Sequence, residues 1–218
     1  MDIPPELIPA SWLPPAWLLY LLVVAISLMR APWFRLGEKD SANTLFGAVA
    51  LVLVFWNLNT GVMPGQSLHY LGASLMTLMF GWEFAFIAVQ VLVITTIFQD
   101  RTTWAMLAIN GLLLGALPTW LTHLLLRLTQ RFLPHNYFIY FFINTFIATI
   151  GGVILLAFAI TGVVSFSHHP RMTQGLLPFL LMLALPEGVL TGMVISILVV
   201  YKPEWVTTFR DNTYLRRR

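Results

Sequence analysis

Seven long apolar segments dominate this sequence, and they constrain its fold more than any other feature. A helix needs roughly 20 apolar residues to cross the hydrocarbon core of a bilayer, and fewer where it ends inside a protein-lined cavity. The segments that reach or approach this length are residues 13–29, 44–58, 67–80, 83–98, 104–126, 137–164 and 176–200. We therefore expect an all-α fold, a polytopic membrane helical bundle of about seven transmembrane helices.

The composition excludes a water-soluble globule. Of the 218 residues, 58% are hydrophobic and only 10% are charged, whereas roughly 25% are charged in soluble proteins. So few charges cannot cover the surface of a soluble protein, but membrane lipid solvates an apolar exterior directly. We expect a multi-pass protein of the cell inner (cytoplasmic) membrane, with lipid as its surroundings and no nucleic-acid partner.

The basic residues indicate the orientation of the bundle, because Lys and Arg accumulate on the cytoplasmic side of membrane proteins. With seven spans and the N-terminus outside, ten of the 12 bases face the cytoplasm, and Arg101 and Arg171 remain outside. We expect one transmembrane domain over residues 1–218, with the C-terminus inside. Residues 1–12, rich in proline, form an extracytoplasmic segment able to fold into the bundle, and residues 201–218 form a basic cytoplasmic tail.

Several kinds of chemistry are excluded by residues that the sequence lacks. There is no cysteine, so thiolate metal sites and cysteine nucleophiles are ruled out. There is also no phosphate-binding loop of the GxxxxGK[ST] type, so any ATP must be hydrolysed by another chain. We expect no enzyme activity and no covalent cofactor.

Candidate metal ligands gather on the predicted outer face. His69 lies near the outer start of the third apolar segment, shortly after Pro64 and Gly65, which break the chain there. The same face carries further nitrogen, oxygen and thioether donors, namely the Met1 amine, Asp2, Glu6, Met63, His168, His169 and Met172. Such donors bind transition metals. A simpler interpretation is that His168 and His169 only hydrate a loop and that the methionines pack, so these residues and Met63 are reserve candidates.

Three intramembrane polar residues, Glu187, Asn110 and Asn144, lie well inside apolar segments. A carboxyl group near mid-membrane is costly unless it is paired, protonated or hydrated. Glu187 therefore indicates either an ion or proton pathway or a structural hydrogen bond, to a helix end freed by Pro186 or to an intramembrane amide. The structural interpretation is favoured, because intramembrane amides commonly join helices.

Two GxxxG patterns, at residues 111–115 and 188–192, predict close contacts between helices. Such contacts form either within one chain or with a partner subunit. Packing within the bundle is the favoured interpretation.

Three stretches of the chain resemble the CbiM/NikM family, the substrate-capturing membrane subunits of cobalt and nickel energy-coupling-factor (ECF) transporters. The opening Met1-Asp2-Ile3-Pro4 resembles Met-His-Ile-Pro of the family. Residues 64–72, PGQSLHYLG, resemble its proline-glycine segment ending in His-Leu-Leu-Gly, and residues 185–191, LPEGVLT, resemble its Glu-Gly/Ala-x-x-Thr signature. The middle is less similar, since Phe98-Gln99-Asp100-Arg101 stands where the family has Phe-Gly-Asp-Gly-Gly.

The resemblance implies a metal site and a mode of transport. It makes Met1, through its amine, and His69 ligands of a divalent transition metal, with Asp2 as a further ligand. Asp2 stands where the family has histidine, so one imidazole nitrogen is lost. The cargo implied is cobalt or nickel, with copper or zinc also open. The partners implied are a transmembrane coupling protein and two ATPase subunits, which supply the energy.

Two other classes of function remain open on the sequence alone. A homologue without the second histidine could be a metal-handling or assembly subunit for a membrane metalloprotein, for example one that uses copper. An intramembrane hydrolase would need a nucleophile and a base, and nothing in the sequence pairs with Glu187 in that way.

Overall fold

The computed structural model is a helical bundle, and it describes residues 3, 5–38, 40–57, 60–63, 66–166, 173–209 and 214. The helices are α1 (Leu13–Arg30), α2 (Ser41–Asn57), α3 (Ala73–Phe80), α4 (Trp82–Phe98), α5 (Leu107–Asn110), α6 (Leu117–Phe132), α7 (Tyr137–Ile139), α8 (Ala148–Ser165) and α9 (Thr173–Tyr201). Two π-helical stretches, η5 (Gly111–Ala116) and η6 (Tyr140–Ile147), connect α5 to α6 and α7 to α8 without a break. Short 3₁₀ turns occupy Pro5–Leu7, Ala10–Trp12, Trp33–Gly37, Trp104–Met106 and Pro203–Trp205.

Four helical stretches of the described chain are long and apolar enough to cross a membrane. They run over Ala10–Arg30, Trp104–Phe132, Tyr137–Ser165 and Leu177–Tyr201. The helices Ser41–Asn57 and Trp82–Phe98 are also apolar but shorter. The expected membrane-type helical bundle is therefore present, and six of the seven predicted segments form helices close to their predicted bounds.

The third predicted segment, residues 67–80, is different. Its helix, α3, begins only at Ala73 and has eight residues, far fewer than a span requires. The preceding residues form a strand, β2 (Gln66–Leu68), which pairs antiparallel with β1 (Thr60–Met63). An apolar count cannot detect this boundary, because a hairpin and a short buried helix are both apolar.

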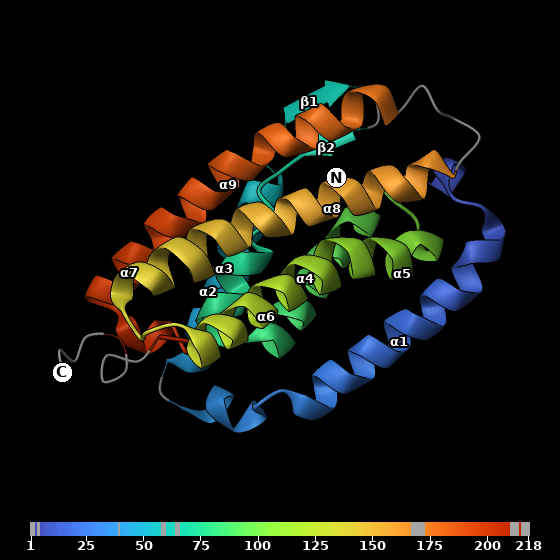
Figure 1. Cartoon of the computed structure of the whole chain (residues 1–218). Helices are drawn as coiled ribbons and strands as arrows, with labels where there is room; N and C mark the ends of the chain where they lie inside the picture. The colour runs from blue at the N-terminus through green and yellow to red at the C-terminus, as the bar shows by residue number, and fades with distance from the viewer. Residues whose placement is uncertain are drawn as a thin grey trace.

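The helices are arranged around this short central helix (Figure 1). Helices α8 and α9 lie side by side along one side of the bundle, whereas α1 lies on the opposite side and contacts α4 and α5. The hairpin lies near the beginning of α9, and α9 ends at the other end of the bundle.

The exterior of the bundle is apolar, and its largely apolar interior also contains buried polar side chains. Asn110, Thr77 and Thr191 are completely buried, while Met29 and Met182 are more than three-quarters exposed. Lipid tails solvate such apolar side chains, and buried hydroxyl and amide groups find partners on neighbouring helices. This distribution agrees with a membrane-embedded bundle.

The glycine pattern at residues 111–115 packs within the bundle. A Cβ atom on Gly111 would lie 2.3 Å from Gln90 Oε1, and one on Gly115 would lie 2.5 Å from Gln90 Nε2. The Gln90 amide donates to the carbonyl groups of Gly111 and Phe86, at 3.3 Å each. The two glycines therefore make room for a side chain of α4, as the internal-packing interpretation predicted.

Helix α3 is enclosed by the rest of the bundle, because each of its eight residues is buried. Gly72 with φ 71° precedes it and Gly81 with φ 88° follows it, so residues in a left-handed conformation mark both ends. At its C-terminal end, the Met79 carbonyl accepts a hydrogen bond from Thr207 N–H at 2.9 Å. The Leu78 carbonyl accepts one from Thr208 Oγ1 at 2.6 Å.

These last contacts show that the segment after α9 packs against the bundle. Val206 and Phe209 are buried, and Tyr140 and Thr208 share a hydrogen bond of 2.7 Å between their hydroxyl groups. Carbonyl groups in the last turn of a helix have no partner within that helix. Residues 206–209 supply the missing donors for α3.

Candidate metal-binding site

His69 lies in the loop between β2 and α3, inside the bundle. Its side chain is 3% exposed, and neither ring nitrogen has a hydrogen-bond partner among the described residues. Burial lowers the pKa of His69 well below its usual value, which favours the neutral imidazole, in which one ring nitrogen can offer a lone pair. Buried polar atoms are rarely left unpaired. This imidazole therefore has the properties of a metal ligand.

The ring of His69 packs on Trp56 of α2. The two ring centroids are 4.1 Å apart, with 36° between the ring planes. Trp56 Nε1 also donates to the Leu71 carbonyl at 3.3 Å. Trp56 therefore contacts the His69 loop through both its ring face and its N–H group.

Glu187 of α9 forms hydrogen bonds with the backbone of the same loop. Its two carboxyl oxygens accept one hydrogen bond each, from Leu71 N–H at 3.2 Å and from Gly72 N–H at 3.1 Å. Glu187 is 2% exposed. The favoured prediction of a structural hydrogen bond is confirmed in kind, but the partner is neither a freed helix end nor an intramembrane amide. It is the backbone beside the candidate metal ligand.

Asn110 connects the N-terminal segment to the bundle. Its Oδ1 accepts from Ile3 N–H at 3.0 Å, and its Nδ2 donates to the Ile3 carbonyl at 3.4 Å and to Thr102 Oγ1 at 3.1 Å. Ile3 is 2% exposed, and it belongs to the same buried apolar cluster as Trp56 and Leu71. The chain near its N-terminus is therefore inserted into the bundle and anchored at Asn110.

Asn110→Leu should release this anchor. The change leaves the Ile3 N–H and carbonyl groups buried without partners, which costs about 1–3 kcal/mol for each group. We expect lower thermal stability together with weaker Ni²⁺ binding, measured by thermal unfolding and by titration of the purified protein. Asn144→Leu is the matched control, because it removes a buried amide that contacts neither Ile3 nor the His69 loop. Equal Ni²⁺ affinities in the two variants would contradict the prediction.

Asn144 lies elsewhere in the bundle. Its Oδ1 accepts a hydrogen bond from Thr129 Oγ1 at 2.7 Å, so it joins η6 to α6. The structure does not bring it to the His69 loop, and its role is that of an interhelical contact.

The other predicted ligands cannot be compared with the structure. Met1, Asp2, His168, His169 and Met172 lie outside the described residues, and Met63 is described only by its backbone in β1. Within the described part of the chain, no three His, Asp or Glu side chains lie close enough together to hold a metal ion. His69 is thus the one predicted ligand whose surroundings the structure defines.

Sequence reasoning missed Trp56, Tyr70 and Thr191 as parts of this site. The Tyr70 and Thr191 hydroxyl groups share a hydrogen bond of 2.7 Å. A signal for Thr191 was present, since it stands one helical turn after Glu187 and therefore on the same face of α9. Trp56 carried no signal, because an aromatic residue in an apolar helix is ordinary.

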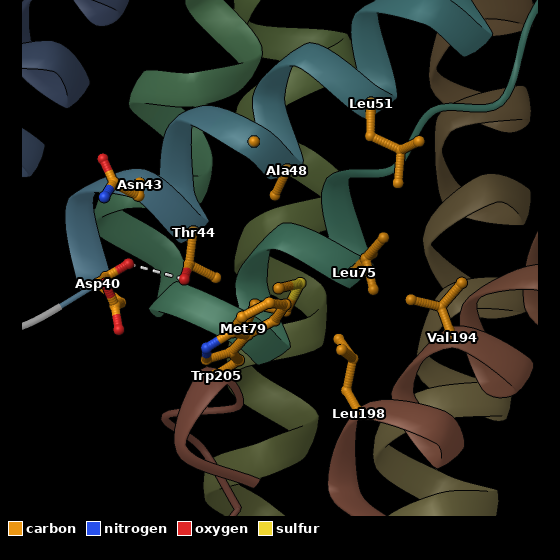
Figure 2. A pocket seen from close by; sticks show the side chains of 11 residues that line it. Asp40, Asn43, Thr44, Ala48, Leu51, Leu75, Met79, Val194, Leu198 and Trp205 are labelled. Carbon is orange, nitrogen blue, oxygen red and sulfur yellow. Dashed lines mark hydrogen bonds between the residues drawn. The ribbon is translucent and has the colours of Figure 1, made fainter. Parts of the chain in front are cut away.

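A separate groove of about 490 Å³ lies between α2, α3 and α9, and Figure 2 shows the polar side chains of Asp40, Asn43 and Thr44 at one end of it. Thr44 Oγ1 donates to the Asp40 carbonyl at 2.7 Å. No histidine is among the described residues that line this groove. The groove therefore lacks the imidazole ligand that the His69 loop offers.

Comparisons with known proteins support the resemblance seen in the sequence. A search of curated proteins finds no match. A solved structure titled as a truncated transition metal transporter superposes with a TM-score of 0.75 at 14% identity, covering 92% of this chain and 99% of that one. Another, titled as a transition metal transporter, gives a TM-score of 0.74 at 14% identity, covering 91% of this chain and 92% of that one. At this identity the likeness shows a shared fold.

The family assignment rests on the sequence itself. The sequence model of one family, described as the cobalt uptake substrate-specific transmembrane region (CbiM), matches residues 2–205, which is nearly the whole chain. The match includes His69, Asn110 and Glu187, the three buried polar residues whose contacts are described above. This chain belongs to the CbiM family of transmembrane proteins, a family of metal uptake and not of enzymes.

Proposed function

We propose that this chain is the membrane-embedded substrate-binding component of an ECF-type transporter for a divalent transition metal ion, cobalt or nickel. The observation that carries the proposal is the His69 imidazole, which is buried, neutral and without a hydrogen-bond partner among the described residues. Imidazole nitrogen is a good ligand for these ions. The anchored N-terminal segment supports the proposal, because it enters the bundle at Ile3.

The proposed ligand set is His69 with the Met1 amine and Asp2. The bundle contributes the shape of the site, since Asn110 fixes the chain two residues after Met1 and Glu187 fixes the loop two and three residues after His69. A cation that binds there exchanges water ligands for protein donors. With an aspartate in place of the histidine of the family, the site has fewer nitrogen donors and weaker preference for nickel.

The proposal also includes orientation and partners. The N-terminus faces outward and the C-terminus faces the cytoplasm, in keeping with the distribution of basic residues. A separate transmembrane coupling protein and ATPase subunits supply the energy for uptake, because this sequence has no phosphate-binding loop of its own.

Metal analysis of the protein, purified with its native N-terminus, tests this function. We expect close to one equivalent of a transition metal, or saturable calorimetric binding of Ni²⁺ or Co²⁺, and co-purification with a coupling protein and ATPases. A protein that binds none of Ni²⁺, Co²⁺, Zn²⁺ and Cu²⁺ would overturn the proposal. Preference for copper, with co-purification of a membrane metalloprotein instead of ATPases, would favour an assembly subunit.

A further inference from the structure

The ring nitrogens of His69 make no hydrogen bond of regular geometry in the described part of the chain, and only the backbone of Tyr70 approaches them. Both ring nitrogens lack a partner in the described part of the chain, although the ring is buried. A metal ligand usually donates its second ring N–H group to a carboxyl or carbonyl group, and that bond orients the ring. Here the orientation must come from the backbone of the loop and from the packing of the ring.

Two residues of α9, one helical turn apart, hold this backbone. The Glu187 carboxyl group accepts hydrogen bonds from the N–H groups of Leu71 and Gly72. The Thr191 hydroxyl group shares a hydrogen bond with the Tyr70 hydroxyl. Each of the three residues that follow His69 is therefore fixed to α9. All of these groups except the Tyr70 side chain, which is partly buried, lie in the buried interior.

A third residue, Trp56 of α2, fixes the loop from another helix. The His69 imidazole packs against the ring face of Trp56. Trp56 Nε1–H also donates a hydrogen bond to the Leu71 carbonyl. Both backbone groups of Leu71 are thus bound, its N–H group to α9 and its carbonyl group to α2. Since α2 and α9 are separate rigid helices, the loop is held between them.

We propose that Glu187, Thr191 and Trp56 are positioning residues of the metal site: they aim the His69 imidazole at the cation without touching it. This inference rests on the proposed function. It explains how the site is preorganised for an ion that binds imidazole nitrogen, and Ni²⁺ is the probe. Preorganisation raises affinity because less conformational entropy is lost in ordering the imidazole when the metal binds.

Glu187→Gln tests the proposal. Glutamine keeps the size of the side chain but turns an NH₂ group toward one of the two backbone N–H donors, so one hydrogen bond is lost. In the metal-free protein, we expect faster hydrogen exchange of the amides of residues 70–72. In a calorimetric titration with NiCl₂, we expect affinity to fall by about tenfold or more, the effect typical of residues that orient a metal ligand.

Gln90→Leu is the matched control, because Gln90 is also buried and bonds to a neighbouring helix but does not contact the His69 loop. It should lower the thermal stability as Glu187→Gln does and leave both Ni²⁺ affinity and the exchange of residues 70–72 unchanged. Thr191→Val, which keeps the shape of the side chain, should change affinity in the same direction as Glu187→Gln but less.

Each outcome of these measurements decides the question. Unchanged exchange in Glu187→Gln, or faster exchange with unchanged Ni²⁺ affinity, would overturn the positioning role. So would an equal loss of affinity in Gln90→Leu, which would mean that general loss of stability is responsible. If the unaltered protein binds no metal, the proposed function fails first, and this failure is recognised without any variant.

Discussion

His69→Ala is expected to abolish high-affinity binding of Ni²⁺ or Co²⁺ by the purified protein. The substitution removes a buried imidazole whose two nitrogens have no hydrogen-bond partner among the described residues, so no competing hydrogen bond is lost with it. The variant should therefore fold, although it loses the ring packing on Trp56 and leaves a cavity. Calorimetric titration measures the binding, and thermal unfolding of the metal-free protein measures the folding.

His135→Ala controls for nonspecific binding to histidine. His135 is exposed and packs at 5.8 Å from the Tyr214 ring, outside the His69 loop. This variant should bind Ni²⁺ with the affinity of the unaltered protein. If His69→Ala retains that affinity while its unfolding temperature is unchanged, His69 is no ligand and the proposed site is wrong.

Gly72→Ala is expected to destabilise the bundle strongly, because both backbone strain and steric overlap oppose it. Gly72 has φ 71°, and a Cβ atom there would lie 2.8 Å from a Val52 methyl group. The left-handed conformation costs an L-residue about 1–2 kcal/mol, and overpacking in a filled interior adds about 1–3 kcal/mol. Relief of the clash with Val52 must shift the backbone of the loop, which disturbs the hydrogen bond from Gly72 to Glu187, so Ni²⁺ affinity should fall with the unfolding temperature.

Two further variants separate the causes of this effect. Gly47→Ala in α2 adds the same methyl group where no atom lies within 4 Å, and it should be neutral or stabilising because alanine favours helix. The double variant with Val52→Ala should recover the steric part of the loss and leave the backbone strain. Unfolding temperatures within error for Gly72→Ala and Gly47→Ala would show that the loop tolerates a side chain at residue 72.

Much of the fold could be predicted from the sequence, because long apolar runs have few alternatives in a membrane. The two uninterrupted stretches Trp104–Phe132 and Tyr137–Ser165 match predicted segments for this reason. The predicted segment 67–80 does not match a continuous helix, because hydropathy measures how apolar each residue is and not where the chain turns. The left-handed Gly72 and the pairing of Gln66–Leu68 with Thr60–Met63 are set by tertiary contacts.

The candidate site was predictable only in part. His69 stood out because a histidine that follows Pro64 and Gly65 in an apolar chain is unusual. The partners of Glu187 could not be predicted, because they are backbone N–H groups, which every residue except proline carries. Ligation by Met1 and Asp2 remains a prediction.

The central helix α3 connects the two ends of the bundle. Its eight residues form a rod about 12 Å long, with the His69 loop at one end and the hydrogen bonds to Thr207 and Thr208 at the other. A packed interior is hardly compressible, and α3 is held by hydrogen bonds at both ends, from Gly72 to Glu187 and from residues 207 and 208 to Met79 and Leu78. A displacement of the loop along the axis of α3 would therefore strain the contacts with Thr207 and Thr208 in the segment that follows α9.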